Sequence, residues 1–245
     1  INIKAPEQNA PGELTNWSPK DKGSQTFTGV VASGGDSDHA DGMAADRAIE
    51  ILGKVKDGPF FLAVGFVRPH VPLVAPKKYF DRYDREEMKA PFVPENDLDD
   101  VPGIISGYKR NSTTYGVTPE LHKGLLQAYY ASVSYMDAQV GRVLDALEEK
   151  GLADNTIVVF SSDHGYLLGH HQKYQKQHLF EEATRVPFII SVPWLKDQHG
   201  RGTTKITELV DLYPTLADLA GLDAPDTLQG TSLKPLLVDT ESRSW

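Results

Sequence analysis

The sequence predicts an α/β fold with a mostly parallel central sheet and helices on both faces. Three short apolar runs have the composition of buried strands, at residues 59–67, 156–162 and 186–193. A strongly periodic stretch at residues 119–150 predicts a long helix after the first run, and a short helix fits between the other two. The order strand, long helix, strand, short helix, strand is typical of a layered α/β domain.

Each strand run carries its own local signals. PFFLAVGFV at 59–67 is a continuous apolar stretch bounded by turn residues, as expected of a strand buried on both faces. TIVVFSS at 156–162 is rich in β-branched residues and ends abruptly at Asp163, and VPFIISVP at 186–193 repeats the pattern. The segment that follows the first run, RPHVPLVAP at 68–76, is predicted to be a loop.

The helix boundaries rest on capping residues and apolar periodicity. Asp41 is placed as the N-cap of a first helix, which contains MAADRAIEILGKVK at 43–56, and Gly151 as the C-cap of the long one. A further helix is predicted at 211–222 and a short one at 77–83. The rest of residues 76–118 is rich in Pro, Asp, Asn and Gly, which predicts a long irregular excursion of the kind that often borders a site.

Composition excludes several classes of protein. With 245 residues, of which 40% are hydrophobic and 24% charged, the chain can bury a sizeable core in one domain. A formal net charge of −9 argues against nucleic-acid binding through a basic surface. No apolar run is long enough for a membrane span, and no signal peptide is visible. The absence of Cys excludes disulfides, thiolate metal sites and a Cys nucleophile within this chain.

Polar residues directly follow two of the strand runs, where ligands of open α/β sheets bind. They are the tripeptide Arg-Pro-His at 68–70 and the group that contains Asp163 and His164. The second pair can share a metal ion only if the strand has already broken into a turn, which Gly165 makes easy. The alternative is a capping Asp beside a hydrogen-bonded His.

Basic side chains gather after Gly165, namely His170, His171, Lys173, Lys176 and His178. In an acidic chain such a local cationic patch suits an oxyanion, sulfate or phosphate, although each residue alone is equally typical of a solvated loop. His70 lies between two prolines at a strand end, where it can protonate a leaving oxygen or be merely structural. Two acidic groups are set aside, a turn with Asp36, Asp38 and Asp41, and a solvated loop with Asp97, Asp99 and Asp100.

Three stretches carry a family resemblance: PFFLAVGFVRPHVPLVAPKKYF, then YYASVSYMDAQV through SSDHGYLLGHHQKYQKQHLFEEATRVPFIISVP, and then LVDLYPTLADLAGL with GTSLKPLL. They resemble the sulfatases of the alkaline-phosphatase superfamily, most closely the iduronate-2-sulfatase-like members. The resemblance implies that Asp163 and His164 bind a calcium ion. It also implies that Lys176, thirteen positions after Asp163, contacts the sulfate, and that His70 aids the leaving group. We predict substrate contacts from Arg68, His171 and Lys173.

Departures from the family pattern suggest that the chain is a segment truncated at both ends. Relatives make a formylglycine nucleophile from a C/S-x-P-x-R motif, and neither that motif nor the N-terminal Asp pair of the calcium site is found here. We therefore assign 1–40 to an irregular lead-in and 41–237 to the C-terminal part of a sulfatase catalytic domain. Residues 238–245 are assigned to the truncated start of a C-terminal region.

The expected function is that of a calcium-dependent sulfuric ester hydrolase that removes sulfate from a sulfated sugar, and this chain alone is expected to be inactive. Two alternatives stay open, a phosphodiesterase or phosphonate monoester hydrolase of the same superfamily, and a non-catalytic carbohydrate- or partner-binding relative. The expected partners are a sulfated saccharide and the remaining N-terminal part of the protein, with no nucleic acid and no membrane span. The resemblance implies export to the periplasm, the extracellular space or the lysosome.

Overall fold

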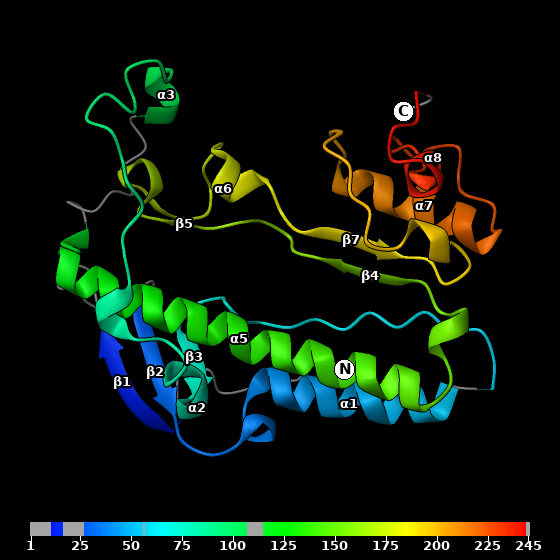
Figure 1. Cartoon of the computed structure of the whole chain (residues 1–245), viewed down its shortest axis with the longest axis horizontal. Coiled ribbons are helices and arrows are strands. Elements are labelled where there is room, and N and C mark those ends of the chain that lie inside the picture. Colours follow the sequence, from blue (N-terminus) through cyan, green and yellow to red (C-terminus); the bar gives the residue numbers. More distant parts are fainter. Residues whose placement is uncertain (1–10, 17–26, 56, 107–114, 244–245) are drawn as a thin grey trace. The chain divides into compact units, whose positions relative to one another are not determined.

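The computed structural model describes residues 11–16, 27–55, 57–106 and 115–243, and Figure 1 labels their helices and strands. These residues divide into two compact units. The first contains the described residues up to Leu152 together with Ser162–Pro187, and the second contains Ala153–Ser161 together with the described residues from Phe188 onward. All the predicted site residues therefore belong to the first unit.

The first unit contains a three-stranded sheet in the order β1-β2-β3. β1 (Gly12–Asn16) pairs with β2 (Thr28–Ala32) in antiparallel fashion, and β2 pairs with β3 (Leu73–Pro76) in parallel. The expectation of an irregular lead-in is wrong for the described strands within 1–40, and the loop expected at 68–76 contains β3. The reason is that all three strands are very short and that β2 and β3 pair across a long stretch of sequence, so none of them leaves a sustained local pattern.

Two long helices pack side by side in this unit (Figure 1). α1 spans Ala40–Val55 and α5 spans Pro119–Glu149, where Thr118 caps the helix by accepting a hydrogen bond from the Leu121 backbone N–H. Gly151 has the left-handed φ of +69° that terminates such helices, so the prediction for α5 is confirmed. The core beneath them is apolar and aromatic, with Phe27, Leu73, Tyr79, Phe80, Tyr115, Leu125, Leu126, Tyr135, Leu168 and Tyr174.

The start of α1 is locked to α5 by one tyrosine. The Tyr135 hydroxyl accepts a hydrogen bond from the Gly42 backbone N–H at 2.8 Å and donates one to the Asp36 carbonyl at 3.0 Å. A Cβ on Gly42 would lie 1.9 Å from the same carbonyl oxygen, so only glycine fits this close approach. Burial raises the pKa of Tyr135, because the ionised phenolate would lose its hydration.

Replacing Tyr135 by Phe should lower the free energy of unfolding by about 1–3 kcal/mol, because the buried Gly42 N–H loses its acceptor. Urea denaturation of the chain measures this change. Tyr130→Phe on the same helix is the matched control, since the Tyr130 side chain is exposed and its hydroxyl removal should alter stability by less than about 0.5 kcal/mol. Equal effects of the two substitutions would contradict the bridging role of Tyr135.

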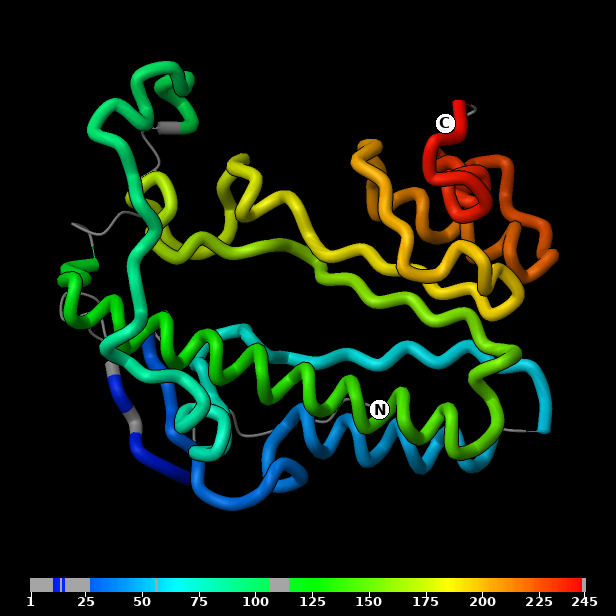
Figure 2. The backbone as a smooth tube through the Cα atoms, in the orientation of Figure 1, coloured from blue at the N-terminus to red at the C-terminus, as the bar shows by residue number. Residues whose placement is uncertain are grey.

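The apolar run at 59–67 is not a buried strand in this structure. Figure 2 shows it as an extended trace, yet no strand pairing is assigned to it among the described residues. Its side chains alternate between exposed and half-buried, and Phe61 is 84% exposed. The expectation of burial on both faces is therefore wrong here, because a strand needs at least one hydrogen-bonded neighbour and none of the described segments pairs with this run.

Shorter elements connect these parts of the first unit. The excursion at 76–118 contains α2 (Lys77–Phe80) and α3 (Gly103–Ser106), and its residues 107–114 lie outside the described part of the chain. A small hairpin pairs β5 (Leu167–Leu168) with β6 (Tyr174–Gln175) in antiparallel fashion, and α6 (Glu181–Thr184) follows it. Among the described residues, no helix is both long and apolar enough to cross a bilayer.

The second unit contains a two-stranded antiparallel ladder of β4 (Val158–Ser161) and β7 (Phe188–Ser191), with α7 (Leu212–Ala220) and α8 (Lys234–Val238). Both strand predictions and the helix predicted at 211–222 are confirmed. Strand direction differs from expectation, because β2 and β3 form the parallel pairing while the other pairings between described strands are antiparallel. Sequence signals mark strands but do not fix their partners.

Candidate functional site

The loop that contains His70 is held in place by the side chain of Asp41. This carboxylate is fully buried and accepts hydrogen bonds from the backbone N–H groups of Val67, at 2.7 Å, and Arg68, at 3.0 Å. Burial raises the pKa of Asp41, while the two N–H donors oppose that shift by stabilising the carboxylate. The N-cap expected at Asp41 is wrong, because α1 already begins at Ala40 and the side chain turns to a distant loop.

Arg68 holds the same loop from within. Its guanidinium is buried and donates hydrogen bonds to the backbone carbonyls of His70 and Pro72. The His70 side chain is exposed, with Nδ1 2.8 Å from the Val71 carbonyl oxygen. Since a carbonyl only accepts, Nδ1 carries the hydrogen and Nε2 is left for proton transfer.

Asp163 and His164 lie just beyond the end of β4, in a turn. Asp163 Oδ1 accepts a hydrogen bond from the His164 backbone N–H at 3.0 Å, and His164 Nδ1 donates to the Gly165 carbonyl at 2.7 Å. His164 Nε2 then lies 3.4 Å from Asp163 Oδ2, and the Asp163 side chain is 84% exposed. A carboxylate oxygen and an unprotonated ring nitrogen are thus directed toward the same side.

This turn is tied closely to α6. The Gly165 backbone N–H donates to the Ala183 carbonyl at 2.9 Å, and a Cβ on Gly165 would lie only 2.1 Å from the Glu182 carbonyl oxygen. Gly165 is therefore required by close packing as well as by the turn. Within the described part of the chain, no group of three or more His, Cys, Asp or Glu side chains is arranged to hold a metal ion.

The basic segment at 169–178 has an unusual backbone. Four residues other than glycine have a positive φ, namely His171 at 54°, Gln172 at 54°, Gln175 at 75° and Gln177 at 69°. Each such residue costs about 1 kcal/mol relative to an ordinary conformation, and such strain persists where the surrounding structure enforces it, often at functional sites. Two of these residues flank Lys176, so the backbone turn sets the direction of that side chain.

The two lysines of this segment differ in environment. Lys173 is buried, and burial lowers the pKa of its ammonium. Lys176 is half-buried. Tyr174 lies between them in sequence and anchors the hairpin in the core, where its ring meets Phe27 edge-on with centroids 5.1 Å apart. The hairpin therefore has a fixed base, and the half-buried Lys176 extends from a rigid support.

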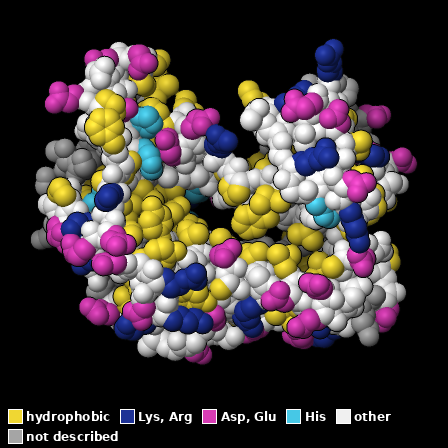
Figure 3. All heavy atoms as spheres, viewed as in Figure 1, with side chains coloured by type: hydrophobic (Ala, Val, Ile, Leu, Met, Phe, Trp, Pro, Cys, Tyr) yellow, Lys and Arg dark blue, Asp and Glu magenta, His cyan; other side chains and the backbone are white. Residues whose placement is uncertain are grey.

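His171 contacts acidic residues that the sequence did not place near it. Its Nδ1 lies 2.9 Å from Asp97 Oδ2, and its Nε2 lies 3.4 Å from Glu182 Oε2. His side chains gather on the surface in this region (Figure 3). The acidic loop behaves as expected at Asp99 and Asp100, which are exposed, whereas the solvated role expected for Asp97 is wrong because its side chain is only 17% exposed.

Five of the seven predicted site residues thus form three local arrangements within one compact unit, while Lys173 and Lys176 take part in none of them. Asp163 meets His164, the Arg68 guanidinium meets the backbone at His70, and His171 meets acidic partners. In the described residues, no hydrogen bond or ion pair joins the side chains of His70, His164 and Lys176 to one another.

Comparison with known proteins decides the family. The sulfatase family model matches residues 7–222. The chain belongs to the sulfatase family. A sulfatase of Formosa agariphila is 39% identical over 207 residues, covering 82% of this chain and 40% of the relative. Human iduronate 2-sulfatase is 37% identical over 222 residues, covering 76% of this chain and 40% of the relative.

Solved structures agree with this assignment and confirm the sulfatase and alkaline-phosphatase-like α/β fold class. A phosphonate monoester hydrolase of Agrobacterium radiobacter superposes with a TM-score of 0.77 at 27% identity, covering 88% of this chain and 45% of that one. A protein solved with its substrate D-glucosamine-2-N,6-O-disulfate has a TM-score of 0.69 at 25% identity, covering 82% and 52%. This sulfatase chain spans less than half the length of the curated relatives named above.

Proposed function

We propose that the complete protein is a sulfuric ester hydrolase that removes sulfate from a sulfated sugar. The observation that carries this proposal is the convergent Asp163–His164 pair, found in a chain that belongs to the sulfatase family. The sugar substrate is supported by the structural neighbour solved with a glucosamine disulfate. Export from the cytoplasm is also proposed, by analogy with the iduronate 2-sulfatase relatives.

Asp163 and His164 would hold a calcium ion together with ligands from the rest of the protein. The exposed carboxylate is the oxygen ligand that calcium prefers, and His164 has Nε2 available because Nδ1 is engaged by a carbonyl. His164 is the weaker of the two ligands, since calcium favours oxygen. The bound ion would neutralise negative charge on the sulfate.

Side chains of this chain would stabilise the remaining charge that develops during the reaction. Lys176 would contact a sulfate oxygen and stabilise the charge that develops on the transferred group. His70, once protonated at Nε2, would give its proton to the leaving sugar oxygen. We propose that Lys173 contributes to substrate binding, and that Arg68 acts by holding the His70 backbone in place.

The attacking group would come from the part of the protein beyond this chain. The 245 residues contain no Cys and no S-x-P-x-R motif from which a formylglycine could be made. The exposed apolar side of residues 59–67, which includes Phe61, fits a surface that this remaining N-terminal part covers. The remaining part would thus complete both the sheet and the active site.

Kinetics of the complete protein test this proposal. We expect hydrolysis of a sulfated monosaccharide and of an aryl sulfate, with activity lost on chelation and restored by added calcium. The phosphonate monoester hydrolase neighbour supports a second candidate, so a phenylphosphonate monoester is assayed in parallel. Faster turnover of the phosphonate ester would favour that candidate, and turnover of neither ester would favour a non-catalytic, binding role.

A further inference from the structure

Both ring nitrogens of His171 lie near carboxylates, and Nδ1 is within hydrogen-bonding distance of one of them. Nδ1 lies 2.9 Å from the Asp97 carboxylate and Nε2 lies 3.4 Å from that of Glu182. The imidazole also stacks on Phe180, with centroids 3.9 Å apart and planes inclined by 15°. The ring is hydrogen-bonded at Nδ1, lies close to a second carboxylate at Nε2 without a hydrogen bond to it, and is stacked on one face, so it has little left to offer a substrate directly. We therefore assign His171 a role through the residues that it contacts.

The contacts of His171 join three separate elements. Asp97 belongs to the excursion loop, defined here as residues 89–101, His171 belongs to the loop of the β5–β6 hairpin, and Glu182 belongs to α6. A neutral imidazole has one N–H and serves one carboxylate, whereas the imidazolium serves both. α6 is in turn connected to the turn that contains Asp163, because the Ala183 carbonyl of α6 accepts a hydrogen bond from the Gly165 backbone N–H.

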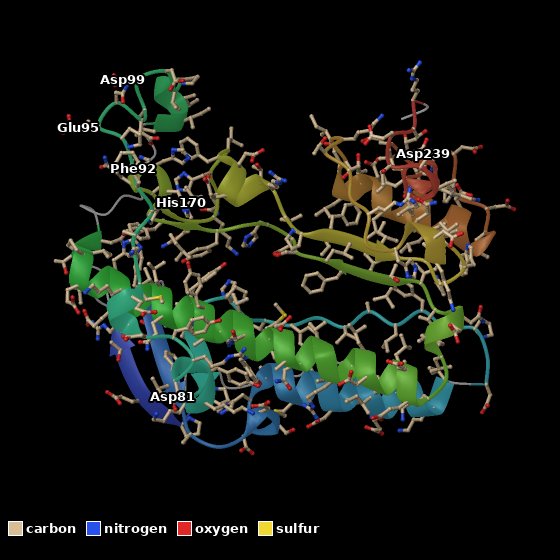
Figure 4. The ribbon with its side chains drawn as sticks, in the orientation of Figure 1. Asp81, Phe92, Glu95, Asp99, His170 and Asp239 are labelled. Atoms are coloured by element: carbon tan, nitrogen blue, oxygen red, sulfur yellow. The ribbon has the colours of Figure 1, made fainter. Side chains whose placement is uncertain are left out.

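The excursion loop meets the hairpin at a second point. A Cβ on Gly169 would lie 3.5 Å from Pro91 Cδ, so the excursion loop and the hairpin lie close together beside the basic segment. Phe92 follows directly and is 90% exposed. Figure 4 shows Phe92 in the same region as His170, with Glu95 and Asp99 further out along the loop. An exposed aromatic side chain thus lies in the same region as the segment that contains Lys173 and Lys176.

We propose that Asp97 and Glu182 are positioning residues that act through His171. Together they clasp the excursion loop against the β5–β6 hairpin, so that the loop forms a fixed wall of the sulfate-ester site. This wall selects the part of a sulfated saccharide that extends beyond the sulfate group. The inference rests on the proposed function for its substrate, while the clasp itself rests only on the contacts of His171.

Hydrogen exchange in the complete protein tests the clasp independently of catalysis. Asp97→Asn keeps the size of the side chain and removes its charge, and it should speed exchange of the amides at 92–101 by about tenfold. Asp99→Asn, on the exposed carboxylate of the same loop, is the matched control and should change nothing. Glu182→Gln should loosen the same peptides, and its combination with Asp97→Asn should be non-additive.

Kinetics with two substrates test the role in selection. For a sulfated disaccharide, Asp97→Asn should raise KM by about tenfold with kcat little changed, whereas for a small aryl sulfate both constants should stay near wild type. Asp97→Glu, which retains the charge, should recover part of the loss. The split between the substrates is the readout that a purely structural tether would not produce.

The outcomes separate the possible failures. Unchanged exchange at 92–101 in Asp97→Asn would overturn the clasp. Faster exchange with equal losses for both substrates would overturn the selective wall. If Asp97→Asn exchanges faster than the wild type but the wild-type protein hydrolyses no sulfate ester, the clasp is upheld and the proposed function is overturned instead.

Discussion

The 245-residue chain alone should hydrolyse no sulfate ester, even with calcium present. Asp163, His164 and Lys176 can polarise a sulfate, but polarisation does not replace an attacking group, and this sequence contains no C/S-x-P-x-R motif from which a formylglycine could be made. Loss of a covalent nucleophile typically removes several orders of magnitude in rate. Assay of the purified chain with an aryl sulfate, at high enzyme concentration, measures this result.

The matched control is the complete protein, purified in the same way and assayed in the same buffer. A folded chain must be verified first, by cooperative urea unfolding, so that inactivity is not simply unfolding. Turnover above the uncatalysed rate by the pure chain would refute the prediction and would require an attacking group among its own residues.

In the complete enzyme, Lys176→Ala should lower kcat/KM by roughly a hundredfold. A charge-assisted contact to a developing oxyanion is typically worth about 3 kcal/mol, and Lys176 is the lysine whose spacing after Asp163 matches the sulfate contact of the family. Lys176→Arg should restore activity only in part, because a planar guanidinium cannot take the place of a compact ammonium without moving the sulfate.

Lys173→Ala is the comparison, and it should lower kcat/KM less than Lys176→Ala does. This substitution should also lower the stability of the fold, because Lys173 is buried and its replacement leaves a cavity in the hairpin. Each variant is therefore compared at equal folded fraction, measured by urea unfolding. A larger catalytic loss at Lys173 would show that the register assigned across GHHQKYQKQH is wrong, and the site with it.

Much of the fold followed from local signals that the structure confirms. The helix predicted at 119–150 has a capping threonine, a proline in its first turn and a left-handed glycine at its end, each of which acts within a few residues. β4 and β7 are likewise confirmed because their β-branched runs are distinct. Such patterns specify an element without reference to the rest of the chain.

Several roles were invisible to sequence because they depend on distant partners. Asp41 has the position of an N-cap, yet its carboxylate binds backbone N–H groups 26 and 27 residues away. Asp97 lies in an acidic run that is typical of a solvated loop, and nothing in that run indicates a contact with His171, 74 residues later. Burial and ion pairing at these positions are properties of the folded chain.

The sequence by itself determined the family and the longer helices, because motif spacing and amphipathic periodicity are local properties of the chain; the chemical roles of His70, Asp163, His164 and Lys176 stay predictions. The tertiary structure decided which strands pair, that Arg68 serves the backbone of its own loop, and that Asp97 and Glu182 enclose His171. The physical reason is that hydrogen bonds and ion pairs require proximity, and proximity between distant segments is set only when the core packs.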